Sequence, residues 1–109
     1  HPASSEIRPD PERAGTYLVG GELGFATVPT MLERGREMFD GGSNASLELD
    51  LGGVTRVDSA GLALLIEWLK VARRAGRGIV YVNVPEQMMA MAQVSGLEGV
   101  LPLERDVRR

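Results

Sequence analysis

The sequence predicts one α/β domain with a small mixed sheet of about four strands and helices mainly on one face. The chain has 109 residues, which suits a single domain with one core. Strand-like and helix-like segments alternate over residues 16–103, an order typical of parallel strands joined by crossover helices. One strand-like segment alternates leucine with carboxylates, whereas a strand covered on both faces is usually apolar throughout. We therefore expect most helices to lie on one face.

The N-terminal third predicts a lead-in, a strand and a helix. Residues 1–15 are rich in proline, serine and charge, so we expect a flexible lead-in there. The run "TYLVGGEL", Thr16–Leu23, is β-branched and aromatic and predicts a short edge strand that bends at its glycines. Apolar residues at near-helical spacing in "TVPTMLERGREMF", Thr27–Phe39, predict a helix of about three turns, which Gly41 and Gly42 stop.

The remaining segments predict strand, helix, strand, helix and a last short strand. "SLELDL", Ser46–Leu51, alternates leucine with acidic residues and is followed by two glycines, which we expect to break the strand. The other expected elements are a long helix over Ser59–Ala75, which stops at Gly76, a β-branched strand over Gly78–Val84, a helix that begins at Pro85 and a strand over Gly99–Leu103. Residues 104–109 are expected to form a tail.

Composition excludes several classes of function. There is no cysteine, and the one histidine is His1, so thiol or Ser-His-Asp catalysis is not provided for. Glycine loops of the kind that cradle phosphates are missing, and two acidic residues, Asp50 and Asp58, are a weak signal for a metal. The net charge is −3, and basic residues do not gather with aromatics, which disfavours nucleic acid as a partner. We expect neither catalysis nor a cofactor.

A small polar cluster, Asp58-Ser59-Ala60-Gly61, precedes the most apolar run in the chain. In one interpretation Asp58 or Ser59 caps the helix by accepting hydrogen bonds from its first N–H groups. In the other, Ser59 is a contact or phosphorylation site. A helix start favours phosphate locally, but a partner packed over the serine would release a doubly charged group.

The long helix carries more apolar surface than one contact requires. Its apolar arc spans about 220°, whereas packing on a sheet needs about 100° or somewhat more. Leu64, Trp68 and Val71 must therefore meet something besides the sheet. Neighbouring helices are one candidate, and a protein partner is the other, since an exposed tryptophan beside a switchable serine would form a hot spot.

The run from "LELDLGGVTRVDSAGL" to "VLPL" resembles the STAS domain family, whose members include anti-sigma-factor antagonists of bacteria. The matching pieces are a strand, "VDSAGL", a long helix, a β-branched strand, a proline-started helix and "SGL", with "GEL" as the exit of the first strand. The resemblance implies that Ser59 is the phosphorylatable or partner-contacting residue. It places Asp58, Ala60 and Gly61 in the same motif.

Two branches of the family are compatible with these residues. "RVDSAGLALLIEW" and "VLPL" look closer to the cytoplasmic STAS subunit of the Mla-type phospholipid ABC transporter, which implies the transporter ATPase as the partner and only indirect contact with the inner membrane. The alternative is an anti-sigma-factor antagonist that binds an anti-sigma serine kinase. Antagonists often carry a second serine where this chain has Ala60. In either branch we expect partner contacts at Asp58, Ser59, Ala60 and Gly61, which Leu64 and Trp68 would extend.

Overall fold

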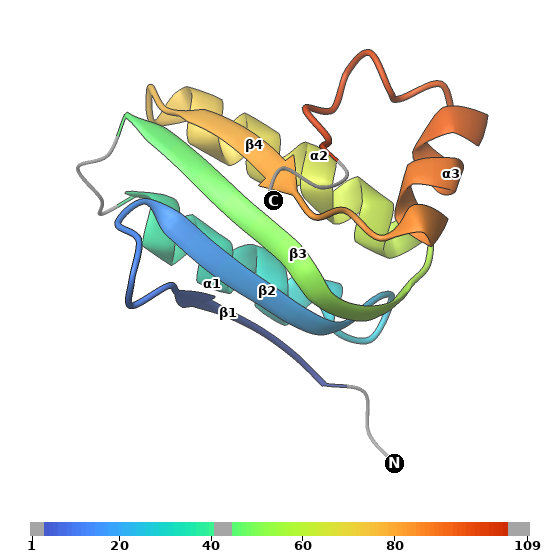
Figure 1. Cartoon of the computed structure of the whole chain (residues 1–109), viewed down its shortest axis with the longest axis horizontal. Helices are drawn as coiled ribbons and strands as arrows, with labels where there is room; N and C mark the ends of the chain where they lie inside the picture. Colours follow the sequence, from blue (N-terminus) through green and yellow to red (C-terminus); the bar gives the residue numbers. More distant parts are fainter. Residues whose placement is uncertain (1–3, 41–44, 105–109) are drawn as a thin grey trace.

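The computed structural model describes residues 4–40 and 45–104. A four-stranded mixed sheet has the order β1-β2-β3-β4, in which β1 pairs antiparallel with β2 and the other two pairs are parallel (Figure 1). The elements are β1 (Ser5–Pro9), β2 (Thr16–Leu23), α1 (Val28–Asp40), β3 (Ser46–Val57), α2 (Ser59–Arg74), β4 (Gly78–Val82) and α3 (Glu86–Val94). The predicted fold class is confirmed. The expected helix stop at Gly41 and Gly42 lies outside the described residues.

The flexible lead-in expected over residues 1–15 is wrong from Ser4 onward. β1 pairs with β2 along its whole length, and Ile7 is buried in the core. Hydrogen bonds close the turn that follows, from the N–H of Asp10 to the carbonyl of Thr16 and from the N–H of Thr16 to the carbonyl of Arg13. β2 is consequently an internal strand and not the expected edge. Residues 1–3 lie outside the described part.

β3 does not break at Gly52 and Gly53 as expected but continues to Val57. Gly53 lies opposite Gly20 of β2, where the register between the two strands shifts. A Cβ on Gly53 would lie 3.2 Å from the carbonyl oxygen of Val19, closer than most side chains approach a backbone. The glycines therefore allow two strands to pass closely at a bulge, and they extend β3 toward α2.

Helices α1 and α2 lie behind the sheet in Figure 1, and α3 lies beside α2. Leu47, Leu49 and Leu51 of β3 are buried in the core, whereas the acidic residues between them are half-buried. Helices thus cover mainly one face, as the alternation predicted. Buried Tyr81 of β4 donates its hydroxyl to the carbonyl of Leu65 in α2 at 2.6 Å, and burial raises the pKa of this phenol well above 10.0.

The C-terminal segment meets the sheet at one point. The expected strand over residues 99–103 is reduced to a single parallel bridge between Leu103 and Tyr81. The N–H of Glu104 donates to the Tyr81 carbonyl, so the expected tail is still attached at its first residue. Residues 105–109 lie outside the described part. Gly76 has φ +75°, in agreement with the left-handed helix stop predicted there.

Candidate docking site at the start of helix α2

Asp58 is the N-cap of α2. Its Oδ1 accepts hydrogen bonds from the backbone N–H groups of Ala60 at 2.8 Å and Gly61 at 3.2 Å. Its Oδ2 accepts a third from the N–H of Phe25 at 3.2 Å, in the loop between β2 and α1. The bond from Phe25, followed by those from Gly61 and Ala60, holds the pKa of Asp58 below its usual 3.8 in spite of partial desolvation. The carboxylate therefore has a structural role and stays ionised.

Ser59 is not needed for capping. It is the first residue of α2 and is exposed, and its hydroxyl has no hydrogen-bond partner among residues 4–40 and 45–104. Of the two residues that could cap the helix, Asp58 and Ser59, the structure shows that Asp58 is the cap. The Ser59 hydroxyl remains accessible for contact with another molecule or for modification.

Gly61 and Gly24 bring the start of α2 close to the end of β2. A Cβ on Gly61 would overlap the carbonyl oxygen of Leu23, so a larger residue would push the helix away. A Cβ on Gly24 would lie 2.8 Å from Oδ2 of Asp58. Both glycines are needed for packing. Gly61 is buried, so the expectation that it contacts a partner directly is wrong.

The expected contribution of Trp68 and Leu64 to docking is also wrong. Both side chains are 0% exposed. The indole of Trp68 packs edge-on against Phe39 of α1, with ring centroids 5.9 Å apart, and its Nε1 lies where a Cβ on Gly35 would be. The wide apolar arc of α2 therefore meets the neighbouring helix α1. Ala60 is half-buried and remains at the edge of the site.

Phe25 is a residue of this site that the sequence reasoning missed. Its side chain is 88% exposed. The sequence feature that indicates an exposed Phe25 is its place in "GFAT", a short loop of otherwise small residues between a strand and a helix. Thr27 fixes this loop, because its Oγ1 accepts from the N–H of Gly24 at 3.1 Å and donates to the carbonyl of Glu22 at 2.6 Å.

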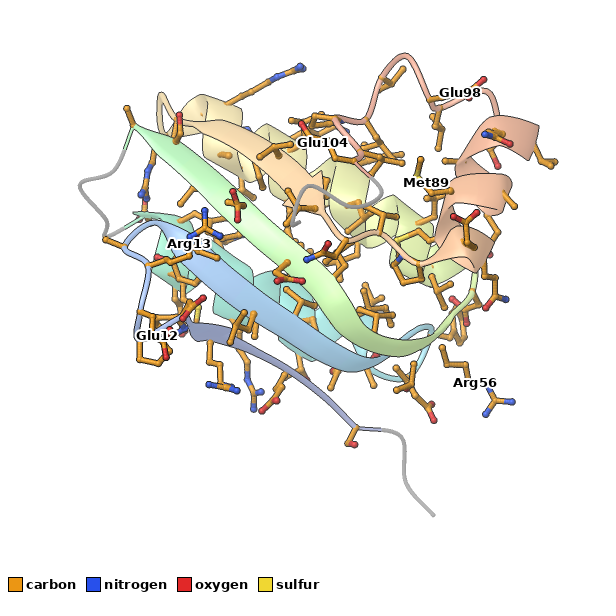
Figure 2. The ribbon with its side chains drawn as sticks, in the orientation of Figure 1. Glu12, Arg13, Arg56, Met89, Glu98 and Glu104 are labelled. Carbon is orange, nitrogen blue, oxygen red and sulfur yellow. The ribbon has the colours of Figure 1, made fainter. Side chains whose placement is uncertain are left out.

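One exposed cation lies beside the loop. Phe25, Asp58 and Arg56 line the same shallow depression. The Arg56 side chain is 77% exposed and extends away from the ribbon (Figure 2). Its Nη1 lies 4.0 Å from Oε2 of Glu22, a distance at which an exposed ion pair contributes little.

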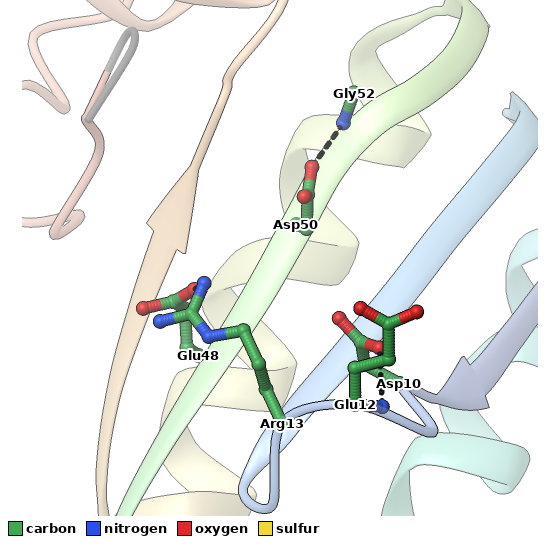
Figure 3. Close-up of polar contacts among 6 residues, drawn as sticks. All are labelled: Asp10, Glu12, Arg13, Glu48, Asp50 and Gly52. Atoms are coloured by element: carbon green, nitrogen blue, oxygen red, sulfur yellow. Dashed lines mark hydrogen bonds and ion pairs between the residues drawn. The ribbon is translucent and has the colours of Figure 1, made fainter. Parts of the chain in front are cut away.

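Polar contacts on the open face of the sheet are separate from this site. Arg13 Nη1 lies 3.2 Å from Glu48 Oε2, and Asp50 Oδ1 accepts from the N–H of Gly52 at 2.8 Å (Figure 3). The residues that the structure describes include no group of three acidic, histidine or cysteine residues able to hold a metal ion. Within the same residues, no helix is long and apolar enough to span a membrane.

The family of the chain follows from comparison with known proteins. Residues 11–103 match the family model described as "Mlab, STAS domain", and the chain belongs to this family. An anti-sigma-B factor antagonist of Staphylococcus epidermidis is 29% identical over 83 residues, 76% of each chain.

Solved structures with the same fold come from both branches. A chain of the Acinetobacter MlaFEDB complex in an ATP-bound conformation gives a TM-score of 0.73 at 24% identity, over 83% of this chain and 94% of that one. An anti-sigma factor antagonist from Mycobacterium paratuberculosis gives 0.72 at 19% identity, over 97% and 88%. At these identities the likeness establishes the fold. The named relatives are an antagonist of a regulatory factor and a member of a multiprotein complex, which indicates proteins that work through protein partners.

Proposed function

We propose that this protein is a non-enzymatic STAS subunit that docks on the ATPase of an Mla-type phospholipid ABC transporter and supports its activity. The observation that carries the proposal is the exposure of Ser59 at the start of α2. Asp58 caps this helix, so the Ser59 side chain is not needed as a cap. A residue placed at a helix start but not used by the fold is available for a partner. In this proposal the protein is cytoplasmic and reaches the inner face of the membrane only through the transporter.

Two comparisons support the transporter function. The matching family model carries the Mlab description, and it covers residues 11–103. The structural match to a chain of the MlaFEDB complex covers 94% of that chain. Ala60 agrees with this choice because it removes the second serine that antagonists often carry next to the acceptor.

The test uses charged and neutral substitutions at Ser59. Ser59→Glu and Ser59→Arg place a large charged group in a contact that fits a small side chain, so we expect both to abolish binding to the purified transporter ATPase. Ser59→Ala keeps the size small and is expected to bind. Circular dichroism and urea unfolding check that each variant is folded, which is expected because Ser59 is exposed. ATPase binding by folded Ser59→Arg at the wild-type level would contradict docking through Ser59, and no binding by the wild type would contradict the proposed function.

The second candidate is an anti-sigma-factor antagonist. It is favoured by the Staphylococcus epidermidis relative, which is named as one and matches 76% of this chain. In that function an anti-sigma serine kinase binds unphosphorylated Ser59, and phosphorylation releases it. Incubation with the kinase and ATP would then add one phosphate, which intact-mass measurement detects and which Ser59→Ala removes. No change in mass would exclude this candidate.

A further inference from the structure

Phe25 is the one mostly exposed aromatic side chain among residues 4–40 and 45–104. It is 88% exposed, whereas Phe39, Trp68 and Tyr81 are each 0% exposed and Tyr17 is half-buried. A single exposed apolar residue is common on protein surfaces and means little alone. The position of Phe25 matters because its backbone is bonded to Asp58, directly before Ser59.

The loop that carries Phe25 is held by several hydrogen bonds. Asp58 Oδ2 accepts from the N–H of Phe25, and Thr27 Oγ1 accepts from the N–H of Gly24. The carbonyl of Gly24 accepts from the N–H groups of Thr27 and Val28, both at 2.9 Å, and the Thr27 hydroxyl donates to Glu22. A fixed backbone lowers the entropy that a partner would lose by ordering the loop. Phe25 is therefore presented before binding.

The charged groups around Phe25 are of both signs, since Glu22, Arg56 and Asp58 line the same depression. Arg56 Nη1 lies 4.0 Å from Oε2 of Glu22, and with 77% of its side chain exposed the guanidinium can reach a carboxylate of a partner. The ionised Asp58 accepts from three backbone N–H groups, two of which form the positive end of α2, so the carboxylate and the helix dipole largely offset each other. A partner segment that buries an aromatic ring here is best matched by an apolar pocket with a carboxylate at its rim.

We infer that Phe25 is an anchor that inserts into an apolar pocket of the transporter ATPase, and that Arg56 pairs with an acidic residue at the rim of that pocket. This inference rests on the proposed function and identifies the contact that would give it affinity. Ser59 then lies at the side of the anchor, where the partner excludes water and a large charged group is not tolerated. Aromatic residues surrounded by such weaker contacts are typical interface hot spots.

The test measures the dissociation constant of the full chain with the purified ATPase. Phe25→Ser keeps the backbone N–H that Asp58 binds, so the fold is expected to be intact. A hot-spot loss corresponds to binding weakened by about 30-fold or more. Val94→Ser is the matched control, because Val94 is 89% exposed but lies at the end of α3. It is expected to bind as the wild type does. Arg56→Glu should weaken binding most at low salt, where charge interactions are least screened.

The outcomes separate this inference from the proposed function. If the wild type binds the ATPase and folded Phe25→Ser binds equally well, the inferred role of Phe25 is wrong and the proposed function is unaffected. If the wild type does not bind the ATPase, both the proposed function and the inferred role of Phe25 are wrong. If Phe25→Ser loses binding while Ser59→Arg retains it, the anchor is supported and the role of Ser59 is wrong. Equal losses in Phe25→Ser and Val94→Ser would also overturn the anchor, since they would show a general effect of apolar surface.

Discussion

The backbone N–H of Phe25 donates a hydrogen bond to Oδ2 of Asp58 at 3.2 Å, across 33 positions of the chain. The other oxygen of the same carboxylate caps α2 through Ala60 and Gly61. One side chain thus joins the loop before α1 to the first turn of α2. The two proposed contact residues, Phe25 and Ser59, depend on it for their relative position.

Asp58→Ala should lower the free energy of unfolding by about 1 kcal/mol, the usual effect of removing an N-cap side chain. It should also weaken binding to the ATPase, because the loop of Phe25 loses a bond. Urea unfolding followed by circular dichroism measures the first effect. Glu33→Ala, an exposed substitution on α1, is the control and should change stability little. Equal stabilities of the two variants would show that the cap contributes nothing.

Asp58 should also make stability depend on acid pH. Its pKa is lowered in the folded state, chiefly by the N–H of Phe25, so the unfolded chain binds the proton more readily. The stabilisation from Asp58 is present above the ordinary value of 3.8 and is lost as pH falls through the lower folded pKa. We expect Asp58→Asn to lose less stability than the wild type over that fall. Parallel acid profiles of urea midpoints for the two proteins would contradict this assignment.

Gly61→Ala should destabilise the protein although alanine favours helices. The gain in helix propensity is at most about 1 kcal/mol, whereas a methyl group forced against the Leu23 carbonyl requires a backbone shift that costs about 1–3 kcal/mol. Gly99→Ala is the control, because a Cβ at Gly99 has no atom within 4 Å in the described structure. Thermal and urea unfolding distinguish the two, and a stable Gly61→Ala would rule out the close approach of α2 to β2.

Ile7→Ala should reduce the free energy of unfolding by about 2 kcal/mol, near the lower end for a buried isoleucine because β1 is at the edge of the sheet. Glu6→Ala, on the neighbouring exposed position, should have little effect. Urea unfolding of both variants measures the difference. If Ile7→Ala were as stable as Glu6→Ala, β1 would not be part of the core.

Trp68 should report a buried environment that docking leaves unchanged. It is the only tryptophan in the chain and is 0% exposed, so its fluorescence should resist quenching by iodide. Saturation with a tryptophan-free variant of the ATPase should alter neither its emission maximum nor its quenching. A shift on binding, with the fold unchanged, would restore Trp68 as a contact residue.

The sequence predicted the helices, the parallel strands and the position of Ser59 because these depend on local patterns. It missed β1 because one buried residue, Ile7, lies among prolines and charges, and its pairing comes from β2. The sequence did not decide what Trp68 contacts, because a wide apolar arc on a helix can pack against a neighbouring helix or against a partner protein. Gly35 of α1 makes room for the indole, but this is visible only when α1 and α2 are placed together in the fold. Phe25 was missed because its exposure and its bond to Asp58 arise from the fold.

The most direct test of the account is affinity purification of the tagged protein and of its Ser59→Arg variant from the host in mild detergent, with mass spectrometry of the copurifying proteins. We predict that an ABC ATPase and its permease copurify with the wild type and are absent with the folded variant. Recovery of a serine kinase with the wild type, without the transporter, would contradict docking on the ATPase and assign Ser59 to an anti-sigma switch.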